Sequence, residues 1–181
     1  MKIKKLLQSR RTINSFKPEK PHEDLIRKAI ELARWAPNHH LTEPWRFYLL
    51  GSETSQAIVE LNSKIVSQKK GEKAGEMKRE KWSAIPGWLV VTMMKSDDPL
   101  QAQEDYAACS CAIQNLALAL WNEGVGIKWT SGDVIRDPEF YNIIWVDQDV
   151  ESVVGLIWYG YPEEIPVSQR KSVEEIVVRL P

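Results

Sequence analysis

The residues best suited to chemistry form two basic groups near opposite ends of the chain. Arg10 and Arg11 are followed by Thr12, and Arg170 stands beside Lys171. A guanidinium presents a planar fork of donors that matches phosphate oxygens, and a threonine hydroxyl adds one more donor, so the first group could cradle a phosphate. The alternative is a solvated basic helix end that complements the helix dipole, which is the commoner role of such residues.

A third group of polar side chains lies in the sequence PNHHLTEPW, residues 37–45. Its two prolines exclude it from the interior of a helix and predict a rigid, polar turn that presents its side chains. His39 or His40 could then hydrogen-bond a ligand or titrate near neutral pH. An exposed loop histidine without a function is the commoner alternative.

The chain lacks the motifs of several enzyme classes. It has no GxSxG, Walker loop, HExxH or Cys-His nucleophile arrangement. Gly124 and Gly126 follow a predicted helix and precede a predicted strand, whereas a dinucleotide fingerprint needs the reverse order and a third glycine. Eight tryptophans and basic groups near both ends instead suit a protein that lends its chemistry to a bound planar, phosphorylated cofactor. Taken singly, each tryptophan fits an ordinary core residue equally well.

These groups must be positioned around one long apolar segment, Tyr106–Trp121. Its interruptions are Ser110, Gln114 and Asn115. A helix that is apolar on nearly every side requires burial on every side, and this segment is shorter than the roughly 20 residues that span a bilayer. We therefore expect a core helix that starts at Asp98-Pro99, ends at Gly124 and is closed off by a second subunit.

Hydrophobic periodicity predicts shorter helices and strands around this segment. The predicted helices are 3–9, 22–35, 52–65 and 137–144, and the predicted strands are 45–51, 88–94, 127–130 and 151–161. A charged run at 69–82 predicts a solvated helical excursion that could also serve as a lid over a pocket. Internal repeats and interdomain linkers are absent, so we expect one domain, 1–181.

Composition argues against several partners and sites. The 24 basic and 25 acidic residues nearly balance, which argues against binding to nucleic acid or to an anionic membrane. Cys109 and Cys111 lie two apart on the central helix and cannot pair there, so we expect inert core residues. Three histidines without metal-ligand spacing argue against a metal site. The basic N-terminus lacks an apolar signal segment, so we expect a cytoplasmic protein.

Five motifs connect these observations: RRT at 10–12, APNHHLTEPWRF at 36–47, GVGIKWTSG at 124–132, VVGLIWYGYP at 153–162 and PVSQRKSVEEIV at 166–177. Together, and in this order, they resemble the FMN-dependent nitroreductase family over almost the whole chain. The resemblance implies an α+β sandwich in which helices flank a mostly antiparallel sheet. It also implies an intertwined homodimer that buries the central helix and holds two FMN molecules at its interface.

The resemblance assigns the two basic groups to the phosphate of FMN. Arg10 and Thr12 match the FMN-contacting Arg and Ser of the family, with Arg11 between them. Arg170, with Lys171 beside it, matches the basic position near the C-terminus that helps to neutralise the phosphate. A phosphate dianion without a cationic partner is costly to remove from water, so the main expected role of Arg10 and Arg170 is to bind the phosphate.

The resemblance places other residues along the flavin ring. In the smaller nitroreductases a histidine in this turn contacts flavin that is bound mainly by the other subunit, and His39 occupies the position of that histidine. Trp35 lies one helical turn before His39, and Pro44 is expected near the flavin ring. The stretch expected to lie along the flavin consists of Trp129, Thr130 and Ser131. Many larger members have Asn in place of Leu41 and Gln in place of Glu43, so this chain resembles the small subgroup that uses the histidine.

The resemblance implies an oxidoreductase in which the flavin carries the chemistry and no protein residue is an obligatory acid or base. NADH or NADPH is expected to reduce FMN in a ping-pong cycle. A small-molecule electron acceptor, such as a nitroaromatic, a quinone or an activated alkene, then takes its place. Reductive dehalogenation or flavin fragmentation, which the family also includes, is an alternative. A flavin-binding or flavin-storing dimer without catalysis is another.

Overall fold

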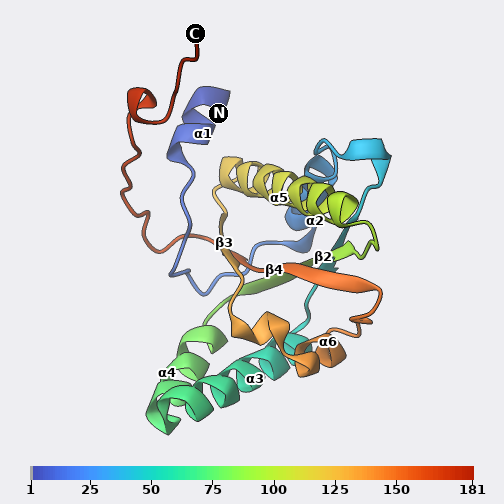
Figure 1. Cartoon of the computed structure of the whole chain (residues 1–181). Helices are drawn as coiled ribbons and strands as arrows, with labels where there is room; N and C mark the ends of the chain where they lie inside the picture. The colour runs from blue at the N-terminus through green and yellow to red at the C-terminus, as the bar shows by residue number, and fades with distance from the viewer. Residues whose placement is uncertain (1) are drawn as a thin grey trace.

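The structure, a computed structural model, describes residues 2–181 and is built on a four-stranded sheet (Figure 1). The strands are β1 (Trp45–Leu49), β2 (Gly87–Met94), β3 (Gly126–Thr130) and β4 (Glu151–Gly160), in the spatial order β1-β2-β4-β3. Each strand is antiparallel to its neighbours, with a register shift between Val91 and Thr92 of β2. β1 and β3 are therefore the edge strands.

Helices cover both faces of this sheet. The helices of the chain are α1 (Ile3–Ser9), α2 (Glu23–Ala33), α3 (Ser52–Lys70), α4 (Glu72–Ser83), α5 (Pro99–Asn122) and α6 (Pro138–Ile143), with 3-10 turns at His39–Leu41, Asp133–Arg136 and Val173–Glu175; α1 does not cover the sheet. Figure 1 shows α2 and α5 on one face and α3, α4 and α6 on the other, and each layer encloses its own hydrophobic cluster. The predicted α+β sandwich with a flanked antiparallel sheet is confirmed.

The central helix α5 is buried along only one side. Asp98 caps it by accepting a hydrogen bond from the amide of Leu100 (2.9 Å). Cys109 is buried, whereas Ala107 and Cys111 are exposed and belong to an open stripe along the helix. The burial on every side that its composition predicts is therefore not reached within one chain.

The expectation that both cysteines are core residues is wrong for Cys111. Residues two apart on an α-helix point about 200° apart, so only one of the two can face the sheet. Burial, and then the charge of Asp105, raise the pKa of the Cys109 thiol to about 12. Cys109 is thus an unreactive core thiol, and Cys111 is an exposed free one.

The charged run at 69–82 forms the end of α3 and most of α4, which pack together as a hairpin. The Ser63 hydroxyl on α3 donates to the carbonyl of Gly75 on α4 (2.9 Å). A side chain at Gly75 would collide with Ser67, so the close approach of the two helices requires glycine. The helical part of the prediction is confirmed. α4 lies on the opposite face of the sheet from α5. Its role as a lid over a pocket stays a prediction.

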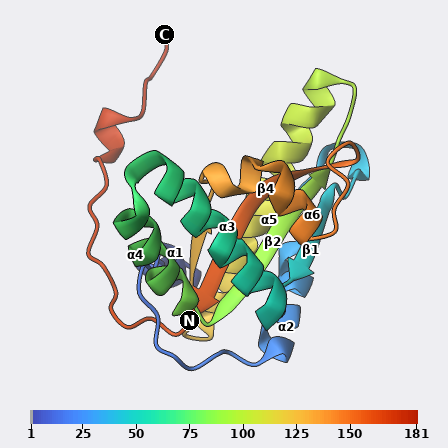
Figure 2. The same cartoon turned by 90° about the horizontal axis from the view of Figure 1, so that it is seen from below.

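The N-terminal segment is tied to the edge of the sheet. The indole of Trp121 on α5 donates to the Ser9 hydroxyl (3.0 Å), and the amide of Ile13 donates to the carbonyl of Ile127 on β3 (3.0 Å). Thr12 forms a β-bridge with the same Ile127, so the segment after α1 runs along β3. After β4 the chain leaves the sheet as an exposed C-terminal arm, residues 163–181, which Figures 1 and 2 show extending outwards.

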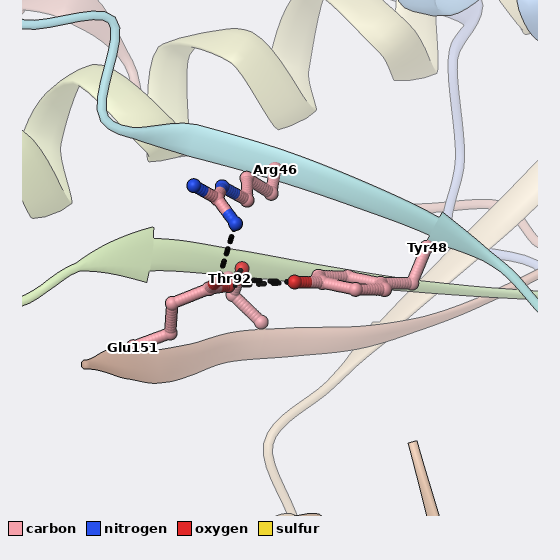
Figure 3. Close-up of polar contacts among 4 residues, drawn as sticks. All are labelled: Arg46, Tyr48, Thr92 and Glu151. Carbon is pink, nitrogen blue, oxygen red and sulfur yellow. Dashed lines mark hydrogen bonds and ion pairs between the residues drawn. The ribbon is translucent and has the colours of Figure 1, made fainter. Parts of the chain in front are cut away.

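A buried carboxylate joins three strands at one end of the sheet (Figure 3). Glu151, at the start of β4, accepts hydrogen bonds from the hydroxyls of Thr92 (2.5 Å) and Tyr48 (2.9 and 3.0 Å). The guanidinium of Arg46 donates to the same carboxylate (2.9 Å). Burial, and then the bond to Glu151, raise the pKa of the Tyr48 phenol. A charge-assisted network thus fastens β1 to β2 and β4.

Replacing Glu151 by glutamine should lower the free energy of unfolding by about 1–3 kcal/mol, because the amide cannot accept from all three donors and adds a donor of its own. Denaturant unfolding followed by tryptophan fluorescence measures the change. Glu164→Gln, at an exposed position on the C-terminal arm, is the matched control and should change stability by less than about 0.5 kcal/mol. Equal stability of Glu151→Gln and wild type would contradict this account of the network.

Two kinds of feature are absent from the part of the chain that the structure describes. No helix within residues 2–181 combines the length and the apolar character needed to cross a membrane. Within the same residues, no three His, Cys, Asp or Glu side chains cluster so that they could hold a metal ion.

Candidate cofactor-binding site

A cavity of about 140 Å³ lies where the N-terminal segment, α5 and β3 meet. Its walls are formed by Arg10, Thr12, Ser110, Ile113, Gln114, Ala117, Ile127 and Trp129. The fold thus brings Arg10 and Thr12, predicted to bind a phosphate, to Trp129, predicted to lie along the flavin. These residues are far apart in sequence, and the bridge between the N-terminal segment and β3 is what joins them.

Positive charge collects around Arg10, which lines this cavity. Burial lowers the pKa of Arg10, and the charges of Arg11 and Arg170 lower it further. Within residues 2–181, none of these three guanidinium groups forms an ion pair with a carboxylate. Basic side chains from the two ends of the chain therefore act on one region of the molecule, which favours the binding of an anion there.

The donors of these side chains are only partly used within the chain. Arg11 donates from Nη1 to two nearby carbonyls (2.7 and 2.9 Å), but its buried Nε has no hydrogen-bond partner among residues 2–181. Arg170 is exposed and donates to two neighbours on the C-terminal arm (2.9 and 3.2 Å), and Lys171 is exposed beside it. A buried donor without a partner costs free energy, so an additional acceptor is expected at this place.

Trp129 forms the aromatic wall of the cavity. Its indole nitrogen donates to the carbonyl of Val154 (3.2 Å), and its ring lies against Gly155 of the neighbouring strand. Side chains alternate along a strand, so Thr130 faces the opposite side of the sheet and can reach a ligand on the Trp129 side only through its backbone. Ser131, the next residue, lines a separate cavity of about 450 Å³.

Gly155→Ala should displace the Trp129 ring, because the added methyl group would overlap the indole. We expect a loss of about 1–3 kcal/mol of stability and a shifted tryptophan emission spectrum. Thermal unfolding and fluorescence of the cofactor-free protein measure both. Gly51→Ala, whose methyl group meets no atom within 4 Å, is the control. Wild-type emission and stability in Gly155→Ala would show that the ring does not occupy this place.

The turn that carries His39 lies at a different point along α5. The Thr42 hydroxyl donates to the buried carboxylate of Asp105 in the first part of α5 (2.6 Å), whereas α1 contacts Trp121 at its end. At 1.5 Å per residue, these two contacts are about 24 Å apart along the helix. Within residues 2–181, His39 is not among the residues that line the Arg10 cavity, so one chain carries two groups of predicted site residues.

Two of the predicted ring contacts near this turn face solvent in one chain. Trp35 is 73 % exposed, and His39 is exposed with its ring packed edge-on against His40 (3.9 Å between centroids). Pro44 is buried instead, and its carbonyl accepts a hydrogen bond from the amide of Met94 (3.0 Å). The turn is thus fixed at its end while its aromatic side chains are open to a second molecule.

The same turn holds backbone strain. His40, Leu41 and Glu43 have φ angles of 53°, 52° and 42°, in the left-handed region that favours glycine. Each such residue costs roughly 1–2 kcal/mol. Glu43 is restricted further because it precedes Pro44. Strain of this kind persists only where surrounding contacts enforce it, and it collects at functional sites.

Sequence reasoning missed two residues that shape these places. Gly155 could have been found, because a lone glycine within a strand pattern indicates a close approach of another group. Asp105 gave no such signal, since an acid near the start of a helix has an ordinary role in complementing the helix dipole. Its buried contact with Thr42 depends on the tertiary fold.

Comparison with known proteins identifies the family. The sequence profile described as the nitroreductase family matches residues 7–161. YfhC of Bacillus subtilis (strain 168), a protein assigned by name to the NAD(P)H nitroreductases, is 33 % identical over 174 residues, which cover 94 % of this chain and 89 % of YfhC.

Solved structures show the same architecture. A nitroreductase-like family protein from Bacillus cereus matches with a TM-score of 0.88 at 28 % identity, covering 99 % of this chain and 96 % of that one. Iodotyrosine deiodinase, in a structure bound to FMN and 3-iodo-L-tyrosine, matches with a TM-score of 0.77 at 21 % identity over 98 % of each chain, which shows a shared fold. Because the profile and the YfhC alignment both extend over most of the sequence, the chain belongs to the nitroreductase family.

Proposed function

We propose that the chain is an FMN-dependent NAD(P)H oxidoreductase that reduces nitroaromatic compounds, quinones or similar acceptors. The observation that carries the proposal is the electrostatic coupling of Arg11 and Arg170 to Arg10, none of them ion-paired with a carboxylate within residues 2–181, where Arg10 lines a cavity with an aromatic wall. FMN combines a phosphate with a planar ring, and such a site suits both parts. Membership of the nitroreductase family and the FMN bound by iodotyrosine deiodinase support the same cofactor.

The residues present fit the phosphate end of this cofactor. Arg10 and Thr12, which line the cavity, would hold the phosphate together with Arg11. Arg170 and Lys171 would complete its neutralisation from the exposed arm. The cationic groups repel one another without an anion, so binding the phosphate relieves that repulsion as well as adding hydrogen bonds.

The residues that would line the ring are Trp129 and the backbone of Thr130 of one subunit, with the exposed Trp35 and His39 of the partner subunit. Ser131 and Pro44 could reach the ring only if binding or dimerisation moved them, because Ser131 lines a separate cavity and Pro44 is buried. When bound, FMN supplies the two-electron chemistry of a ping-pong cycle, in which NADH or NADPH is the donor and leaves before the acceptor enters. The chain binds and orients the ring and keeps water away from its face. No side chain is required to gain or lose a proton in this scheme.

Three features of the single chain support a homodimer. The open stripe of α5 includes Ala107 and Cys111, and in the described part of the chain the outer edge of β1 has no partner strand. The C-terminal arm exposes the apolar side chains of Ile165, Val167, Val173, Ile176, Val177, Val178 and Leu180. A second copy would cover apolar surface of this kind and bring His39 of the partner subunit to the flavin, which completes the site.

Anaerobic mixing of the FMN-loaded protein with NADPH or NADH tests the proposed activity. We expect the visible flavin absorbance to bleach and to return when a nitroaromatic compound or a quinone is added. Flavin that neither nucleotide bleaches would overturn the oxidoreductase in favour of a flavin-binding dimer. Bleached flavin whose absorbance returns only with a halogenated aromatic compound would assign reductive dehalogenation instead.

A further inference from the structure

The proposed function assigns no contact with FMN to the buried carboxylate of Asp105. Asp105 is 3 % exposed and lies one helical turn before the core residue Cys109. Within residues 2–181 it forms no ion pair, and its side chain accepts one hydrogen bond, from the Thr42 hydroxyl at 2.6 Å. A carboxylate is costly to bury, so its placement indicates that this contact has a role.

Thr42 lies inside the strained turn. Its neighbours Leu41 and Glu43 both have positive φ angles. The amide of Glu43 donates to the side chain of Asn38 (3.0 Å), but that bond lies within the turn and cannot fix the turn relative to the fold. The hydrogen bond from Thr42 to Asp105 is the polar side-chain link between the turn and α5.

The chemistry of the pair fixes one orientation. A carboxylate only accepts, so the threonine hydroxyl must donate, and burial removes the water that would compete. Such a charge-assisted bond is stronger than a neutral one. It sets the position of Thr42, whose amide also donates to the carbonyl of His39 (3.3 Å). The constraint on Thr42 is thereby passed to His39.

We propose that Asp105 is a positioning residue that, through Thr42, holds the strained turn in the conformation that presents His39 to FMN bound mainly by the partner subunit. The inference rests on the proposed function. His39 touches the cofactor, and Asp105 acts through the turn. Because α5 also lines the Arg10 cavity, one helix sets the positions of both groups of site residues.

Variants of Thr42 test the inference in the FMN-loaded protein. Thr42→Val removes the hydroxyl at nearly constant volume, Thr42→Ser keeps it, and His39→Ala removes the group that is positioned. Fluorescence quenching measures FMN affinity, and the visible absorption spectrum reports the surroundings of the bound ring. We expect Thr42→Val to bind FMN about tenfold more weakly and to give the flavin spectrum of His39→Ala, while Thr42→Ser matches wild type.

The double variant His39→Ala with Thr42→Val separates positioning from folding. Because Thr42 acts through His39, the double variant should bind FMN no more weakly than His39→Ala alone. Thr54→Val, at a half-buried threonine on α3, is the matched control and should leave affinity and spectrum unchanged.

Each other outcome overturns the inference. A Thr42→Val protein that unfolds at lower temperature but keeps wild-type affinity and spectrum would assign the pair a structural role only. Additive losses in the double variant would show that Thr42 does not act through His39. Wild-type protein that binds no FMN would overturn the proposed function, and the inference with it, whereas the first two results leave the proposed function standing.

Discussion

The double variant Arg10→Ala with Arg170→Ala should purify colourless, with FMN affinity lowered about 10²–10⁴-fold. Each arginine would give the phosphate charge-assisted hydrogen bonds worth roughly 1.5–3 kcal/mol, and neither uses its charge in an ion pair within residues 2–181. Absorbance of the purified protein gives the FMN content, and fluorescence titration of the cofactor-free protein gives the affinity. Retained stoichiometric FMN would contradict the assignment of these residues to the phosphate.

The cofactor-free form of this variant should be at least as stable as cofactor-free wild type. Burial and the charges of its neighbours lower the pKa of Arg10, so the folded state disfavours the charged form at every pH below that pKa, and removing the charge relieves the cost. Loss of FMN without loss of stability therefore excludes misfolding as the cause. Arg27→Ala with Arg79→Ala removes the same charge from exposed positions and should keep its FMN.

Ala107→Glu should convert the protein to a monomer and strip its flavin. Ala107 is exposed on α5 of the single chain, where glutamate is a good helix former and should change stability by less than about 0.5 kcal/mol. In a dimer that covers this stripe, the same carboxylate would be buried without a partner, at a cost of several kcal/mol. Sedimentation velocity and FMN content are the measurements, because a monomer would lack the ring contacts of the partner subunit.

Met77→Glu provides the matched control for this experiment. Met77 is exposed on α4, on the opposite face of the sheet from α5 (Figure 1). The control should sediment as wild type does and keep its flavin. An Ala107→Glu protein that remains dimeric and yellow would show that the open stripe of α5 is not the interface.

Much of the fold was predictable from local signals. Asp98-Pro99 and Asp137-Pro138 mark the starts of α5 and α6, where each aspartate accepts a hydrogen bond from the second residue after it. Pro162 follows soon after the end of β4. These signals act over a few residues of sequence, so periodicity and capping suffice to predict them.

Other features depend on residues that are distant in sequence. In the sequence alone, Glu151 resembles an ordinary polar residue at the end of a strand, because its hydrogen-bond partners Tyr48 and Thr92 come from two other strands. Leu41 gave no sign of a left-handed conformation, since it is neither glycine nor asparagine and the contacts that hold the turn are tertiary.

The candidate site was predicted in parts. Arg10 and Arg170 could be proposed as phosphate ligands by type and by resemblance, and the mutual effect of their charges is visible only in the fold. Placing His39 on a part of α5 away from the Arg10 cavity requires the contact between Thr42 and Asp105, which no sequence pattern indicates.

Combined absorbance and sedimentation velocity on the freshly purified wild-type protein can establish whether two chains together hold FMN, because one boundary reports both mass and bound flavin. We expect a dimer at micromolar concentration that carries one FMN per chain, with flavin absorbance moving together with protein absorbance. Protein that sediments as a monomer and takes up no FMN on reconstitution would contradict this expectation.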